Sequence, residues 1–206
     1  MINLLKKIIT IINFRIGEMK RVIHIKKTRK NSIRLRKNNK TDYKRWKNSG
    51  ELLQDWDDRT KILAEMIEPG SHIIEFGAGN MSLKNMLPIN CTYTATDICA
   101  RTPEYLICDL NEIIEFDLSK FDTAVFSGVF EYVYDIEKVF KQLEPAIDNI
   151  VLSYACVEIS NANRLNSGWL SDYSKKELEH IFAKFKYRIV EYKEWRKQSL
   201  YSLKRY

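Results

Sequence analysis

From residue 72 to the end of the chain, short apolar runs alternate with stretches of helical spacing, and this alternation limits the fold most strongly. Seven runs have the length and composition of strands: HIIEF, CTYTATDI, EYLICDL, FDTAVFSG, NIVLSYACV, YRIVEYKEW and QSLYSLKRY. Helical segments such as NMSLKNML, DIEKVFKQLEPA and SKKELEHIFAKF separate several of them, which favours parallel pairing. The last two runs follow each other directly and predict an antiparallel hairpin. The pattern therefore predicts an α/β fold with a mainly parallel seven-stranded sheet and a C-terminal antiparallel hairpin.

The first of these strands ends in a turn that carries almost no side chains. Glu75 and Phe76 close the strand, and Gly77 and Gly79 follow. Glycines permit a tight turn and allow the main chain to approach another molecule closely. A dinucleotide-binding turn would have a third glycine three residues later, where this chain has Ser82. The turn therefore predicts a ligand other than NAD.

Acidic and polar residues also end the next three strands. Asp97 ends the second strand, and Asp109 ends the third within the segment ICDL. The fourth strand runs into FSGVFEYV, which contains Ser127. Because the carboxyl ends of parallel strands meet at one edge of a sheet, we expect these groups to form one ligand site.

These four segments, in this order, resemble the class I S-adenosylmethionine-dependent methyltransferases from about Trp56 to the C-terminus. EFGAGN resembles the first motif of that family, TATDI the acidic second and ICDL the adenine-contacting third. FDTAVFSGVFEYVYD resembles the segment around the family's fourth strand. The resemblance implies a Rossmann-like three-layer sandwich over residues 42–206, forming a methyltransferase domain with S-adenosylmethionine as its cofactor.

The resemblance also implies individual roles at the cofactor site. Glu75 would contact the ammonium group directly or through water, and Asp97 would accept hydrogen bonds from the ribose hydroxyls. Asp109 would accept from the adenine amino group, with Ile98 and Leu110 on either side of the ring. The other residues predicted to bind the cofactor are Phe76, Gly77, Gly79 and Ser127.

Methyl transfer mainly requires alignment of donor and acceptor, with a base in addition when the acceptor is a hydroxyl. The three histidines, His24, His72 and His180, lie away from the carboxyl edge of the predicted sheet. Glu131 is therefore the candidate catalytic base, and the alternative is an acid that binds backbone amides at a helix start. Many relatives carry a histidine where this chain has Tyr132. The DPPY motif of base-modifying amino methyltransferases is absent.

The acceptor is expected to contact the loops after the fourth and fifth strands and the N-terminal helices. The loop after the fifth strand is the long segment SYACVEISNANRLNSGWLSDYS. Tyr132, Tyr154 and Trp169 are the candidate substrate residues. Such side chains suit a glycan, and they suit a base or an aromatic metabolite almost equally well. The leading hypothesis is O-methylation of a small molecule, a glycan or a lipid-linked precursor. The alternatives are an RNA methyltransferase tethered by a basic arm, and a non-catalytic partner that keeps the fold.

Charge divides the chain into a basic beginning and an acidic remainder. Residues 1–48 hold 16 of the 34 lysines and arginines but only 2 of the 27 acidic residues, so they carry +14 and the rest carries −7. Nucleic-acid enzymes usually have a basic catalytic body, so nucleic acid is the less favoured partner. Residues 2–16 predict an amphipathic helix, and residues 26–40 predict a mobile basic segment.

We therefore expect residues 1–41 to form a basic amphipathic arm. An apolar helical face beside cationic residues predicts peripheral membrane contact through residues 1–40, at the inner face of the membrane of a cytoplasmic protein. A disordered or self-packed N-terminus is an equal alternative. The four cysteines form no C-x-x-C pair and lie near no histidine, so we expect neither a metal site nor a disulfide framework.

Overall fold

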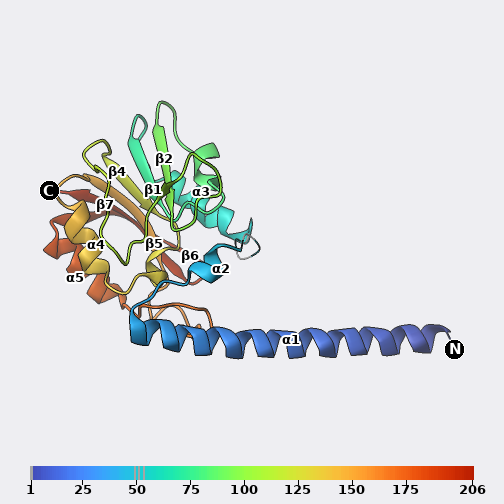
Figure 1. Ribbon diagram of the computed structural model, residues 1–206. Helices are drawn as coiled ribbons and strands as arrows, with labels where there is room; N and C mark the ends of the chain where they lie inside the picture. The colour runs from blue at the N-terminus through green and yellow to red at the C-terminus, as the bar shows by residue number, and fades with distance from the viewer. Residues whose placement is uncertain (1, 49, 51, 53) are drawn as a thin grey trace.

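A computed structural model describes residues 2–48, 50, 52 and 54–206, and a seven-stranded sheet forms the centre of its body (Figure 1). The strand order is β3-β2-β1-β4-β5-β7-β6. The strands are β1 (His72–Phe76), β2 (Thr92–Asp97), β3 (Leu106–Ile107), β4 (Thr123–Phe126), β5 (Asn149–Tyr154), β6 (Tyr187–Trp195) and β7 (Gln198–Arg205). The first five pair in parallel, and β7 runs antiparallel to both β5 and β6. The predicted sheet with its C-terminal hairpin is confirmed.

Helices cover both faces of this sheet and complete three layers. Helix α3 (Asp57–Ala64) and the short 3-10 helix η3 (Ser82–Asn85) pack on one face. Helices α4 (Ile136–Leu143) and α5 (Lys175–Lys184) pack on the other face. Three shorter helices are α2 (Tyr43–Trp46), η2 (Gln54–Trp56) and η4 (Phe130–Tyr132).

The two apolar layers follow from the alternation of side chains along each strand. Ile73 and Val125 belong to the layer under α3, whereas Ile74 and Phe126 belong to the layer under α4 and α5. All four side chains are fully buried. Strands buried on both faces need continuous apolar runs, which is why HIIEF and DTAVF lack the alternation of a half-exposed strand.

Two elements are shorter than the sequence predicts. The predicted helix NMSLKNML is only the single turn η3, because Met81 adopts a left-handed conformation at φ 57° immediately before it. The predicted strand EYLICDL pairs only at Leu106 and Ile107. By contrast, α5 begins as predicted at Ser174, whose Oγ accepts from the Glu177 amide at 3.2 Å in a capping box.

Helix α1 (Ile2–Asn38) is continuous, so the prediction of a mobile basic segment over residues 26–40 is wrong. Lysine and arginine are good helix formers, and the end of the helix packs on the body. Ser32 Oγ donates to the Leu165 carbonyl at 3.0 Å, and Arg36 forms two hydrogen bonds of 2.7 and 2.8 Å with the Asp172 carboxylate. A division between arm and domain at residues 41 and 42 stays a prediction.

The first part of α1 projects away from the body (Figure 1). In the part of the chain that the structure describes, no helix is both long enough and apolar enough to span a bilayer.

Candidate functional site

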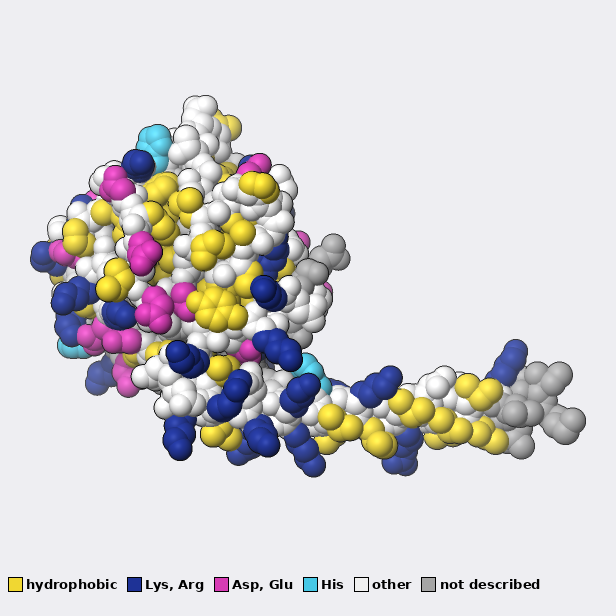
Figure 2. Space-filling view, in the orientation of Figure 1, with side chains coloured by type: hydrophobic (Ala, Val, Ile, Leu, Met, Phe, Trp, Pro, Cys, Tyr) yellow, Lys and Arg dark blue, Asp and Glu magenta, His cyan; other side chains and the backbone are white. Residues whose placement is uncertain are grey.

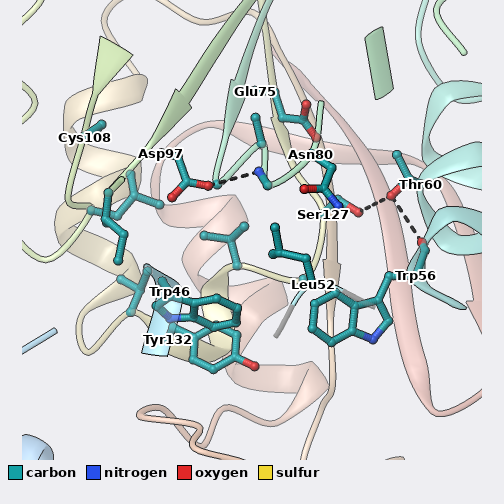
Figure 3. Close-up of a pocket in the computed structure, with 18 of the residues that line it drawn as sticks. Trp46, Leu52, Trp56, Thr60, Glu75, Asn80, Asp97, Cys108, Ser127 and Tyr132 are labelled. Carbon is teal, nitrogen blue, oxygen red and sulfur yellow. Dashed lines mark hydrogen bonds between the residues drawn. The ribbon is translucent and has the colours of Figure 1, made fainter. Parts of the chain in front are cut away.

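A cavity that is partly open to solvent lies at the carboxyl ends of β1 to β4 (Figure 3). One wall comes from the strand ends and is called the sheet wall. It contains the sequence-predicted residues Glu75, Gly77, Gly79, Asp97, Ile98, Asp109, Leu110, Ser127 and Tyr132. The facing wall, called the N-terminal wall, consists of Thr41, Trp46, Leu52 and Trp56.

The turn after β1 needs its glycines for conformation and for space. Gly77 has φ +69°, and a Cβ there would lie 2.5 Å from the Val129 Cγ2 atom. Gly79 has φ +56°, and its amide donates to Asp97 Oδ2 at 3.0 Å (Figure 3). The turn therefore presents bare main chain to the cavity and fixes the acid at the end of β2.

Asp97 is held in place by groups on both sides. Besides the Gly79 amide, the Cys99 amide donates to its Oδ1 atom at 3.2 Å, and Arg101 forms an ion pair with it at 3.2 Å. The side chain lines the cavity although only 6% of the residue surface is exposed. An ionised carboxylate has about four acceptor positions, so the carboxylate can still accept hydrogen bonds from a ligand.

Glu75 is the other acid of the sheet wall, and it is almost completely buried. Burial raises the pKa of its carboxyl group to about 8, although the nearby Arg59 charge and the hydrogen bond from Tyr93 act in the opposite direction. The Tyr93 hydroxyl donates to Glu75 Oε2 at 2.5 Å. Near neutral pH, this carboxyl is therefore poised to lose its proton when a cation binds beside it.

Arg59 lines the cavity and supports the sheet wall at the end of the fourth strand. Its guanidinium donates to Ser127 Oγ at 3.2 Å, to the Ser127 carbonyl at 3.0 Å and to Gln198 Oε1 at 3.0 Å. A Cβ at Gly128 would lie 2.5 Å from the same guanidinium, so Gly128 leaves the space that Arg59 occupies. Burial lowers the pKa of Arg59 and Glu131 raises it, yet arginine remains charged.

The N-terminal wall is tied to the sheet wall through Asp109. Thr41 Oγ1 donates to Asp109 Oδ1 at 3.0 Å, and the Tyr43 hydroxyl donates to Oδ2 at 2.8 Å. Trp46 packs edge-on against Tyr132, with ring centroids 4.7 Å apart. Asp109 thus binds the segment after α1 while it faces the cavity, and its contact with adenine stays a prediction.

Glu131 lies outside the cavity lining, with 1% of its surface exposed. Its Oε1 atom accepts from the Ala155 amide at 2.9 Å and from Gln198 Nε2 at 3.3 Å. Burial raises the pKa of this carboxyl, against the attraction of the Arg59 charge. Its Oε2 atom is buried and has no hydrogen-bond partner among the residues that the structure describes. This position is that of an acid that supports Arg59 and the β5 end, and its role as a base stays a prediction.

Three other predicted site residues lie away from the cavity. Phe76 stacks on Phe126 in the core, with ring centroids 5.0 Å apart. Tyr154 is fully buried and its hydroxyl accepts from Arg164 Nη2 at 2.8 Å, which holds the long loop together. Trp169 packs against the same arginine, 4.7 Å from ring centroid to Cζ. In this structure, the loop side chains therefore stabilise the loop, and only Tyr132 of the predicted substrate residues reaches the cavity.

The arrangement suits a cationic ligand that carries hydroxyl groups. The sheet wall combines the carboxyl groups of Glu75 and Asp97 with bare main chain, and the N-terminal wall adds aromatic surface. Among the described residues, no group of three or more histidines, cysteines and acids is placed to hold a metal ion. The sequence did not indicate Thr41 or Trp46, because neither belongs to a local motif and both reach the cavity through the tertiary fold.

No protein-family model and no curated protein sequence matches this chain. Solved structures do match. A 1,6-didemethyltoxoflavin N1-methyltransferase from Burkholderia thailandensis, with bound 1,6-didemethyltoxoflavin and S-adenosylhomocysteine, is 13% identical, has a TM-score of 0.58 and covers 86% of each chain. An S-adenosylmethionine-dependent methyltransferase from Aquifex aeolicus is 17% identical with a TM-score of 0.53, covering 71% of this chain and 89% of its own.

The same fold also serves another reaction. The (4+2)-cyclase SpnF is 10% identical with a TM-score of 0.58, covering 72% of this chain and 80% of its own. These similarities show that the chain has the fold of class I S-adenosylmethionine-dependent methyltransferases. Function must be argued from the site, since one fold carries different activities.

Proposed function

We propose that the protein binds S-adenosylmethionine in this cavity and transfers its methyl group to an oxygen atom of a small molecule, a glycan or a lipid-linked precursor. One observation carries the proposal: Glu75 and Asp97 flank a bare glycine turn at the carboxyl edge of the sheet. The Gly79 amide of this turn donates a hydrogen bond to Asp97. Two acids and exposed main chain match a ligand with an ammonium group and ribose hydroxyls.

Each part of the sheet wall has a separate task in this proposal. Glu75 binds the ammonium group and gives up its proton as the ligand enters, since its pKa is about 8. Asp97, oriented by two amides, accepts hydrogen bonds from the ribose. Ile98 and Leu110 enclose the adenine ring, and Asp109 lies at its amino edge. When bound, S-adenosylmethionine supplies a methyl group on a positively charged sulfur, which makes displacement easy.

The protein contributes mainly alignment and exclusion of water. Arg59 and Ser127 fix the end of β4, and Trp46 with Tyr132 form an aromatic surface that lines the cavity. Among the described residues that line the cavity there is no histidine. The proposal therefore places the acceptor beside Tyr132, with transfer driven by position rather than by a strong base.

Two alternatives have an observation in their favour. The basic charge of α1 favours an RNA methyltransferase. The cyclase with a similar fold shows that this fold occurs without a methyltransferase name, which favours a non-catalytic partner that keeps the fold. The acidic charge of the remaining chain counts against RNA. The proposed location is the cytoplasm, with peripheral contact at the inner face of the membrane through residues 1–40.

Transfer of label from methyl-labelled S-adenosylmethionine tests the function. Cell extract is separated into lipid, glycan, small-molecule and RNA fractions after incubation with the purified protein or with Asp97→Ala. We expect label in a lipid, glycan or small-molecule fraction that depends on Asp97. Label in RNA alone would support the tethered RNA enzyme. Cofactor binding without transfer to any fraction would support the non-catalytic alternative.

A further inference from the structure

The projecting part of α1 exposes an unusually large apolar surface. Five apolar residues follow one line along the helix at intervals of three or four, and between 45% and 65% of each is exposed: Ile8, Ile12, Ile16, Met19 and Ile23. Residues spaced in this way lie on one side of an α-helix. A contiguous apolar stripe about 24 Å long, at 1.5 Å per residue, is rare on a soluble protein and marks an interaction surface.

The same line continues into the docked part of the helix, where Ser32 and Arg36 contact the body, and there its residues are basic instead of apolar. At the same three- and four-residue intervals the next positions are Lys26, Lys30, Arg34 and Lys37. All four are exposed. One side of α1 therefore carries five apolar residues followed by four basic residues, and it is called the outer stripe. Figure 2 shows the apolar side chains on the projecting part and basic side chains on the part beneath the body.

The body binds the other side of the helix. Ser32 and Leu35 are buried against it, and a Cβ at Gly168 would lie 3.7 Å from the Thr28 Cγ2 atom. At about 100° per residue, Thr28, Ser32 and Leu35 point roughly opposite to the outer stripe. The outer stripe thus faces away from the body along the length of the helix.

We infer that the outer stripe is a membrane-binding surface, which holds α1 flat on a bilayer that contains anionic lipids. The apolar part would enter the boundary between headgroups and acyl chains, and the basic part would contact lipid phosphates. This inference rests on the proposed peripheral location and is independent of methyl transfer.

Charge decides between a bilayer and a second copy of the chain. In a parallel pair of α1 helices, the four basic residues of each copy would face one another. In an antiparallel pair, they would cover the apolar residues of the partner. An anionic bilayer is complementary to both parts at once. The bilayer would repel the acidic body, because the chain after residue 48 carries a net charge of −7. Helix α1 would then lie between the bilayer and the body.

The docking also sets how the body sits above the bilayer. The loop after β5 and the segment after α1 both connect the helix to the carboxyl edge of the sheet: Arg36 donates to the Trp169 carbonyl at 3.1 Å, and Tyr134 donates to the Lys40 carbonyl at 2.7 Å. Thr41, three residues beyond the end of α1, lines the cavity. The edge that carries the cavity therefore faces the helix, which suits an acceptor presented at the membrane surface.

Two charge-reversal variants of the full chain test the surface, and both have the same net charge because each replaces two basic residues with glutamate. Lys26→Glu with Lys30→Glu changes the outer stripe, and Lys7→Glu with Arg21→Glu changes other sides of the same helix. Ile12→Asp in the stripe is paired with Phe14→Asp, an exposed apolar position off the stripe. Each protein is sedimented with vesicles of phosphatidylcholine, with and without phosphatidylglycerol.

We expect the wild type to bind only the anionic vesicles, with stripe variants binding at least about tenfold more weakly and their controls within about threefold of the wild type. The inference would be overturned if the stripe and control variants lost binding equally or if the wild type bound no vesicles. Self-association of the chain through the outer stripe, without vesicle binding, would also overturn it. Binding of S-adenosylhomocysteine, measured on the same proteins, is expected to stay unchanged. Its absence in all of them would count against the proposed function and not against the membrane surface.

Discussion

The two walls of the cavity differ in how the chain builds them. The sheet wall consists of strand ends, where a glycine turn and an acid follow directly from the local sequence. The N-terminal wall consists of Thr41, Trp46, Leu52 and Trp56. The segment after α1 reaches the same cavity through contacts such as the hydrogen bonds from Thr41 and Tyr43 to Asp109. The first wall carries the two acids, Glu75 and Asp97, to which we assign cofactor binding. The second closes the cavity and depends on how α1 docks.

This difference separates two kinds of failure. Damage to the sheet wall should reduce ligand affinity in a protein that still folds. Damage to the docking of α1 should reduce stability first, and affinity only through the position of Thr41 and Trp46.

The largest effect is expected from truncation inside the docked part of α1. Removal of residues 1–40 eliminates the contacts of Ser32 and Arg36 with the loop after β5. We expect a loss of about 2–3 kcal/mol in the free energy of unfolding, since a buried interface and its hydrogen bonds disappear. Removal of residues 1–24, the matched control, should change it by less than about 0.5 kcal/mol because that part projects into solvent. Urea unfolding measures both, and equal values for the two truncations would show that the docked part contributes nothing.

Asp97→Ala is expected to have the next largest effect. The substitution removes a charged acceptor from the ribose and frees the Gly79 amide, so the affinity for S-adenosylhomocysteine should fall by about 1–3 kcal/mol. Glu115→Ala removes an exposed acid outside the cavity lining and is the control. Calorimetry on both variants measures the difference. An affinity within twofold of the wild type would remove Asp97 from the site.

The pKa of Glu75 predicts a pH dependence of binding. The pKa of Glu75 is about 8 in the native protein, whereas its ordinary value is 4.5. Between pH 4.5 and about 8, the native protein therefore keeps a proton on Glu75 that the unfolded chain has lost. Stability from this group is therefore present at low pH and decreases as pH rises from 4.5 to about 8. Ligand affinity should change in the opposite direction, increasing by up to about tenfold per pH unit between pH 6 and 8 as the carboxyl ionises.

Calorimetry in two buffers of different ionisation enthalpy would detect the released proton. Glu75→Gln should abolish both the proton release and the pH slope. A wild-type affinity that is constant from pH 6 to 8 would contradict the assignment of Glu75 to the ammonium group.

The smallest effect is expected for Glu131→Gln. The amide keeps the acceptor for Ala155 but removes a charge near Arg59, so we expect turnover within about threefold of the wild type and a lower melting temperature. Steady-state rates with the identified acceptor and a thermal melt check this. A loss of 10²–10⁴-fold in turnover, with unchanged cofactor affinity, would establish Glu131 as the general base.

The sheet wall could be predicted because its signals are local. Each strand end couples an apolar run to a turn residue or an acid within a few positions, as in Glu75 to Gly79, and parallel strands bring these ends together. That reasoning brought nine predicted residues to one cavity. The four other predicted residues lie outside the cavity lining for a common reason. Phe76, Glu131, Tyr154 and Trp169 have suitable chemistry near the right strand ends. Alternation and loop packing bury the first three, and Trp169 packs against Arg164 within the loop.

The N-terminal wall could not be predicted because its signals are not local. Thr41 and Trp46 occupy a segment with no motif, and their positions depend on a helix that the sequence indicated only to residue 16. The continuation of α1 to Asn38 became visible only with the docking partners Leu165 and Asp172, more than 120 residues away in the chain.

The most direct test of the central claim is calorimetric titration of the full-length protein with S-adenosylmethionine, S-adenosylhomocysteine and NAD. The sheet wall has acids for an ammonium group and a ribose, and Ser82 stands where a pyrophosphate-binding turn would have its third glycine. We predict saturable binding of both S-adenosyl compounds at one site per chain and no binding of NAD. Binding of NAD without either S-adenosyl compound would contradict the account.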